Sequence, residues 1–178
     1  MRKLLTLIVG VAVATAGFAM AVALAAPQED TVTVTSNLKA RFEVPRPQGV
    51  PAGATGAFTG TAVELANDRA RVTWRLTLSK LSGRATAAHI HRGRAGKAGP
   101  VLVALCGPCR SGQRGTARIT HAQLRTIRSG ATYVNVHTAK NAAGEIRGQV
   151  KASGGSGSGS DSTDTTTTTT TGEPPPYP

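Results

Sequence analysis

Apolar and polar side chains alternate with a period of two over much of this chain. In the first such stretch the apolar residues take even positions: Val32, Val34, Leu38, Ala40, Phe42 and Val44. This alternation predicts a half-buried β-strand that ends at the Pro-rich segment 45–51. A weaker strand is predicted at 57–65, and Asn67-Asp68 indicates a turn. The clearest strand runs from Val72 to Leu78, where arginine and threonine separate the apolar residues.

Further short strands follow toward the C-terminus. The continuous apolar run at 101–105 is typical of a buried strand. A Gly- and Arg-rich loop at 92–99 precedes it. The remaining predicted strands are 85–91, a short one at 117–119, and a closing pair at 133–138 and 145–151.

One segment has helical character. Thr120 is a candidate N-cap, and Gln123 stands three residues later as its capping-box partner. Leu124 and Ile127 share a face, and Gly130 provides the stop signal. About eight short strands with one short helix predict an antiparallel β-sandwich.

The two ends of the chain differ from this middle region. Residues 1–25 have a basic start, a long apolar run and an Ala-Leu-Ala end, which predicts a signal peptide. An uncleaved anchor helix is the alternative, since the run approaches the length that spans a bilayer. After cleavage no stable membrane span is expected. Residues 26–35 lead into the first strand, and 36–151 form the domain. The Gly/Ser/Thr/Pro tail at 152–178 is predicted to be disordered, either as a glycosylated or wall-spanning segment or as a plain linker.

Charge is distributed as unevenly as hydrophobicity. The formal net charge is +12, and every Lys and Arg except Arg2 and Lys3 lies in the middle region. Such a field attracts anionic partners, and a basic face around Arg71, Arg75, Arg92 and Arg94 is the candidate contact. Anionic cell-wall or surface polymers are therefore the candidate partners. The alternative is that the many arginines only reflect a GC-rich coding sequence, since the basic residues are spread along the chain rather than clustered. No recognition helix and no aromatic interleaving is present, which argues against specific nucleic-acid binding.

Two segments carry a family resemblance. One is Ala88-His89-Ile90-His91, and the other extends from Tyr133 through His137 to Asn141-Ala142-Ala143-Gly144-Glu145-Ile146-Arg147-Gly148-Gln149. They resemble the CHRD domain, which is named after chordin and is common in secreted bacterial proteins. The resemblance covers most of residues 36–150. It implies a secreted or cell-envelope location and a Greek-key β-sandwich that is immunoglobulin-like or Cu/Zn superoxide dismutase-like.

The same segments place three of the four histidines on two predicted strands. His89 and His91 are two residues apart, so they share one face of a strand. Their Cα atoms are then about 6.6 Å apart. His137 can supply a third ligand if its strand lies alongside, and Glu145 is a candidate fourth ligand or hydrogen-bond acceptor. Three histidines with an open position suit zinc or copper. The H-x-H also resembles copper ligation in Cu/Zn superoxide dismutases, but the bridging His and the zinc ligands of those enzymes are missing.

A purely structural role for the histidines is the alternative. An imidazole at the rim of a sandwich can hydrogen-bond a backbone carbonyl or the Glu145 carboxylate without any metal. The sequence offers no nucleophile beside a histidine at a recognisable spacing. We therefore expect a non-enzymatic binding or structural module, with a copper- or zinc-binding protein as the alternative function.

The two cysteines form the motif Cys106-Gly107-Pro108-Cys109. A redox-active C-x-x-C normally opens a helix, which lowers the thiol pKa. Here the motif follows an apolar strand and precedes Arg110-Ser111-Gly112, so no helix is expected. A disulfide that closes a tight turn is the preferred prediction, and redox activity or metal ligation by the two thiols is the alternative.

Overall fold

The computed structural model describes residues 31–154. The predicted signal peptide at 1–25 and the tail beyond residue 154 lie outside the described residues. The elements in chain order are β1 (Thr31–Lys39), the 3-10 helix η1 (Ala40–Phe42), β2 (Thr55–Leu65), β3 (Arg69–Ser79), β4 (Ala85–Arg92), β5 (Val101–Cys106), β6 (Gln113–Thr120), α1 (His121–Arg128), β7 (Thr132–Thr138), β8 (Ile146–Gln149) and β9 (Lys151–Ser153).

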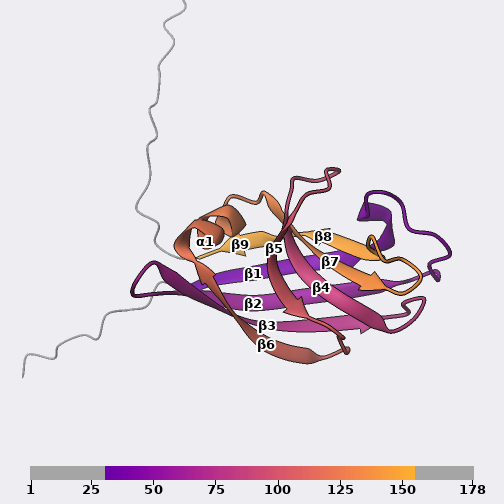
Figure 1. Cartoon of the computed structure of the whole chain (residues 1–178), viewed down its shortest axis with the longest axis horizontal. Helices are drawn as coiled ribbons and strands as arrows, with labels where there is room; N and C mark the ends of the chain where they lie inside the picture. The colour runs from indigo at the N-terminus through magenta and orange to yellow at the C-terminus, as the bar shows by residue number, and fades with distance from the viewer. Residues whose placement is uncertain (1–30, 155–178) are drawn as a thin grey trace, which may run out of the picture.

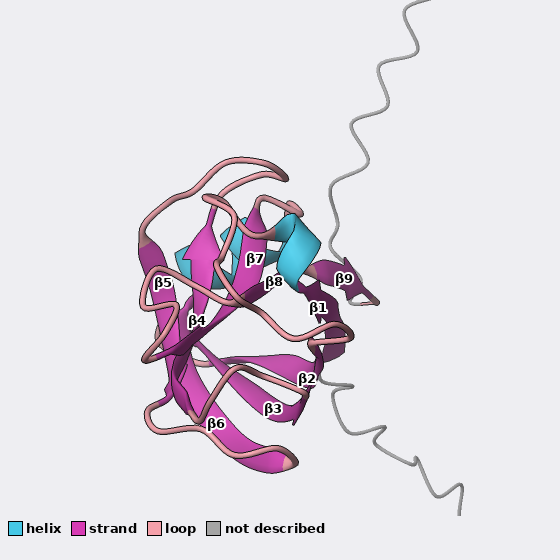
Figure 2. Ribbon diagram, turned by 90° about the vertical axis from the view of Figure 1, so that its right-hand side faces the viewer, coloured by secondary structure: helices cyan, strands magenta, loops and turns pink. Residues whose placement is uncertain are grey.

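The strands of this region form one antiparallel sheet. Hydrogen-bonded neighbours follow the order β5-β4-β7-β8-β1-β2-β3-β6, and β9 pairs with β1. The two end strands, β5 and β6, lie close together, so the curved sheet nearly closes into a barrel (Figures 1 and 2). The predicted antiparallel β fold with one short helix is confirmed. The expected sandwich of two sheets appears here as a single sheet that wraps around its core.

Alternation along the strands builds that core. In β1 and β3 every second side chain points inward, and all of the inward residues except Ser36 are apolar. Phe58, Leu76 and Ile146 are among the largest side chains that are fully buried. Burial of such side chains stabilises the fold by about 1.5–3 kcal/mol each.

Two strands differ from their predicted form. β1 stops at Lys39, where its partner β2 begins at Thr55, so the chain beyond has no ladder to join and turns into η1. β5 is an edge strand rather than the expected buried one: only Val103 is buried, and Val101 is 54% exposed. A strand at the end of the pairing order has one open edge, and a continuous apolar run does not reveal that position.

The helix confirms the capping prediction. The Thr120 side chain accepts a hydrogen bond from the Gln123 backbone N–H at 3.2 Å, and the Gln123 amide oxygen accepts from the Thr120 N–H at 2.8 Å. Leu124 and Ile127 are its buried residues. At eight residues α1 is too short for a bilayer, and none of the described helices is long and apolar enough to cross one.

Candidate metal centre

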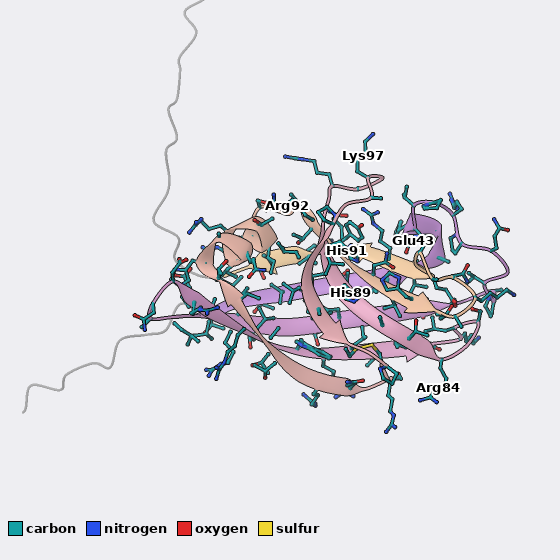
Figure 3. The ribbon with its side chains drawn as sticks, in the orientation of Figure 1. Glu43, Arg84, His89, His91, Arg92 and Lys97 are labelled. Atoms are coloured by element: carbon teal, nitrogen blue, oxygen red, sulfur yellow. A yellow bond between two sulfur atoms is a disulfide. The ribbon has the colours of Figure 1, made fainter. Side chains whose placement is uncertain are left out.

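The three histidines lie on two neighbouring strands. His89 and His91 belong to β4, His137 belongs to β7, and these strands pair antiparallel. Val134 and Val136 of β7 are fully buried in the core. Because alternate residues point to opposite faces, the histidines lie on the outer face of the sheet. Figure 3 labels His91 below the loop that carries Lys97, with His89 further along β4.

The imidazoles come together closely enough to share one ion. One ring nitrogen from each histidine lies within 4.8 Å of the others. His89 Nδ1 and His137 Nε2 are 3.2 Å apart and share a hydrogen bond, which a bound ion would replace. Tetrahedral bonds of about 2.0–2.1 Å separate ligand nitrogens by about 3.3 Å. The His89–His137 pair already has this spacing, and the other two separations are at most 4.8 Å.

Backbone carbonyls orient two of the rings. His91 Nδ1 bonds the Gly99 carbonyl oxygen at 2.9 Å, and His137 Nδ1 bonds the Ala142 carbonyl oxygen at 3.0 Å. A carbonyl at Nδ1 requires the proton there and leaves Nε2 with its lone pair. His91 Nε2 is buried and has no hydrogen-bond partner within residues 31–154.

The surroundings favour the neutral imidazole. Burial is the main cause that lowers the pKa of all three histidines. For His89 the nearby charges of His137 and His91 lower the pKa further. The carbonyl bonds of His91 and His137 act in the opposite direction without cancelling the effect of burial. The rings therefore carry lone pairs, the form that binds a metal ion, at neutral pH.

Tyr133 and Arg147 form one wall of the site. The His91 ring is stacked on the Tyr133 ring at 5.0 Å, with an interplanar angle of 10°. The Arg147 guanidinium carbon lies 3.3 Å from the Tyr133 ring centroid. Arg147 Nη2 donates to the carbonyls of Arg94 and Lys97 at 3.0 and 2.8 Å. This wall ties the 93–100 loop, with its Gly99 acceptor, to the histidines.

The sequence alone gave no sign of this role for Arg147 or of the burial of Glu43. Arg147 reads as a solvated outward residue of a strand, yet it is only 1% exposed. Glu43 occupies an odd, polar position in the predicted first strand, yet it is 3% exposed. Its carboxylate accepts hydrogen bonds from the Val44 N–H and from the Asn135 amide, and burial raises its pKa. Both residues are covered by loops, which periodicity does not place.

Glu145 takes a different position from the predicted one. Its fully buried carboxylate accepts hydrogen bonds from the Ser82 N–H and hydroxyl, the Thr138 hydroxyl and the Asn141 amide. These bonds hold its pKa below the usual value, although burial acts to raise it. Glu145 is therefore not in the histidine cluster. It fixes the 139–145 turn, which carries the Ala142 carbonyl that orients His137.

The predicted basic face divides between two regions. Arg71 and Arg75 are exposed on β3, whereas Arg92 ends β4 and Arg94 lies in the following loop. β3 pairs with β2 and β6, and β4 pairs with β5 and β7, so the four arginines share no ladder. The residues that oppose Arg71 and Arg75 are Arg118 and Arg114 of β6, which the sequence did not single out.

The cysteines form the predicted disulfide. Cys106 and Cys109 are bonded across a four-residue turn at the end of β5. The pair closes this turn as expected, and no free cysteine remains in the chain.

Comparison with known proteins identifies the domain. The CHRD domain matches residues 34–150, from β1 to the end of β8, and this segment contains the whole histidine cluster. Searches of curated proteins and of solved structures give no match. Because the match spans more than half of the chain, this protein belongs to the CHRD domain family.

Proposed function

We propose that this protein is a CHRD module that binds one copper or zinc ion through His89, His91 and His137. One observation carries the proposal: a nitrogen of each ring lies within 4.8 Å of the others, while backbone carbonyls hold the second nitrogen of two rings. Carbonyl-oriented imidazoles are the usual environment of metal-bound histidine. Within residues 31–154 the buried His91 Nε2 has no hydrogen-bond partner, so its lone pair is available to an ion.

The donor set supports copper or zinc over other ions. All three donors are neutral imidazole nitrogens, which suit zinc, copper and nickel better than magnesium or calcium. Three protein ligands leave a fourth position open. We propose a binding role rather than a reaction, because no carboxylate of residues 31–154 hydrogen-bonds the three rings. Glu145, the closest in sequence, is held by the Ser82 and Thr138 hydroxyls.

The strand order supports a more detailed fold assignment. We propose that β3 to β6 form a Greek key, because β6 returns to lie beside β3 and close to β5. The arrangement as a whole then corresponds to the superoxide dismutase-like barrel rather than to the two separate sheets of an immunoglobulin domain. Nuclear Overhauser contacts between the backbone protons of β5 and β6 would test the closure of the barrel.

We place the protein outside the cytoplasm. The Cys106–Cys109 disulfide supports an oxidising compartment, as does the signal-peptide pattern in residues 1–25. Mass spectrometry of the exported protein would test this placement through the mass of its N-terminus.

The metal proposal is tested with protein that carries no His tag. We expect one equivalent of copper or zinc per chain and a rise in melting temperature on adding the metal. His137→Ala should abolish both effects. His121→Ala is the matched control, since His121 is the fourth histidine and lies in α1, away from the cluster. Stoichiometric binding that survives His137→Ala, or no binding by the wild type, would rule out this site.

A second candidate function, association with anionic wall or surface polymers, is favoured by the charge distribution. The chain has a net charge of +12, and Arg71, Arg75, Arg92 and Arg94 are all exposed. Binding should be stronger to an anionic polymer than to a neutral one of equal length and should weaken with salt. Equal binding to both polymers would contradict this candidate.

A further inference from the structure

Two neighbouring strands repeat the pattern Arg-x-Thr-x-Arg. It occupies residues 71–75 of β3 and 114–118 of β6. The antiparallel register places Arg71 opposite Arg118 and Arg75 opposite Arg114, with Thr73 opposite Thr116 between them. We call the four arginines the arginine ladder. All four, and both threonines, are exposed.

The register of this ladder is fixed from the inner face. Trp74 lies opposite Gly115 and is 3% exposed. A Cβ at position 115 would lie 2.3 Å from Trp74 Cζ2, so only glycine leaves room for the indole ring. A slip by one residue would turn the arginines of β6 into the core. The packing of Trp74 against Gly115 therefore fixes the register in which the arginines of β3 and β6 lie opposite each other.

Like charges that face each other across a ladder are destabilising. No carboxylate of residues 31–154 offsets this repulsion. Glu43 and Glu145 are buried elsewhere, Glu64 lies 3.6 Å from Arg128, and Asp68 lies 3.4 Å from His121. The outward neighbours on β2 are Thr59, Thr61 and Val63. Within the part of the chain that the structure describes, the ladder thus keeps four cations together with no carboxylate partner.

We propose that the arginine ladder binds the phosphate groups of a linear phosphate-bearing polymer. Opposite side chains start about 5 Å apart, and the two arginine pairs lie about 13 Å apart along the strand. Each pair can hold one anion, and the two threonine hydroxyls add donors between them. This inference rests on the second proposed function and gives it a place and a ligand class.

Phosphate fits this donor set better than carboxylate does. The oxygens of a carboxylate lie in one plane, whereas those of phosphate are tetrahedral and can accept forked guanidinium bonds from two strands together with a hydroxyl. Nucleic acid is a poorer fit, because bases bind by stacking on exposed aromatic rings. Trp74 is buried, and the exposed large apolar residues of the described chain, Phe42 and Val101, lie on neither β3 nor β6.

The test compares two variants of equal charge. The ladder variant carries R71Q, R75Q, R114Q and R118Q, and the control carries R46Q, R84Q, R110Q and R125Q, all at exposed positions. The probe is inorganic polyphosphate, measured by calorimetry with the full chain. We expect the ladder variant to lose affinity by about tenfold or more and to show a shallower salt dependence. The control should stay within about twofold of the wild type, since its arginines make no phosphate contacts.

Each other outcome contradicts a defined part of the inference. If both variants lose the same affinity for polyphosphate, net charge alone determines binding. That result would overturn the arginine ladder as the binding site but would leave the second proposed function intact. Tighter binding of a sulfated polysaccharide than of polyphosphate would overturn the phosphate assignment. Tighter binding of single-stranded DNA than of polyphosphate would overturn the choice of a polymer without bases. If the wild type binds no polyanion, the second function fails as well. Circular dichroism and thermal unfolding of each variant report whether the fold is intact.

Discussion

At the scale of single residues, the metal proposal depends on imidazoles that stay neutral. His89, His91 and His137 have lowered pKa values because they are partly buried beside one another. Their unfolded pKa lies near 6.5. Below that pH the unfolded chain binds more protons than the folded one, so the metal-free fold loses stability on acidification.

The first prediction concerns this pH dependence. Stability from the three histidines is fully present above about pH 6.5 and falls as the pH drops through that value toward the lower folded pKa values. Denaturant titrations of the metal-free protein at pH 7.5 and 5.5 should show the loss. The double variant H89Q/H137Q should lose less over the same interval. An equal loss in both proteins would mean that the histidines are not the source.

Glu145 supports a second prediction at this scale. Glu145→Gln keeps the side-chain shape but turns an acceptor into a donor that faces the Ser82 and Thr138 hydroxyls. The cost should be about 2–4 kcal/mol in unfolding free energy. Metal affinity should fall too, because the turn that holds the Ala142 carbonyl loosens. Glu64→Gln, at an exposed surface pair, is the control and should change neither quantity.

The sequence predicted the histidines but not their setting. The spacing of His89 and His91, and the alternation around His137, placed each ring on the correct face of its strand. It could not place Glu145, Glu43 or Arg147, because each has at least one partner far away in the chain. Side-chain period is a local signal, and loop contacts are not.

At the scale of elements, the sequence predicts a feature correctly where the interacting residues are close together in the chain. The capping box at Thr120 and Gln123 was predicted and is present, because both residues belong to one turn. The edge position of β5 was missed, because it depends on which strands pair and not on the strand itself. The long pairing of β6 with β3 was missed for the same reason.

The cap gives a third prediction. Thr120→Ala removes the acceptor for the Gln123 N–H and should cost about 1 kcal/mol. Thr126→Ala is the control in the same helix, since its hydroxyl only bonds the Ala122 carbonyl one turn back. That change should be neutral or slightly stabilising, because alanine has the higher helix propensity. Thermal unfolding of both variants measures the difference, and equal effects would argue against the cap.

The β3–β6 register gives a fourth prediction. Gly115→Ala forces Trp74 to move and should cost about 1–3 kcal/mol through overpacking. Polyphosphate binding should weaken as well, because the ladder shifts with the strand. Gly83→Ala is the control, as nothing lies within 4 Å of a Cβ there. Tryptophan fluorescence should change in Gly115→Ala alone, since the chain has a single tryptophan.

At the scale of the whole molecule, the nearly closed sheet separates its two candidate binding surfaces. The histidines lie on β4 and β7, and the arginine ladder lies on β3 and β6. Along the pairing order β8, β1 and β2 stand between them on one side, and β5 stands between them on the other. The sequence predicted the three histidines, but of the arginine ladder only Arg71 and Arg75. The strand order, which the sequence did not predict, decides that they form two surfaces and not one.

This separation gives the last prediction, that metal and polyphosphate bind independently. Neither ligand contacts residues of the other surface, so neither has a differential affinity through which to shift the other. The Kd for polyphosphate should agree within about twofold, a coupling below about 0.5 kcal/mol, with and without saturating zinc or copper. The stabilisation that each ligand adds to the unfolding free energy should sum when both are present. Calorimetric titration in both orders measures this. A tenfold change in either Kd would show that the two surfaces are linked through the sheet. The polyphosphate site would then have to reach beyond β6 to β5, the strand that stands between it and the histidines.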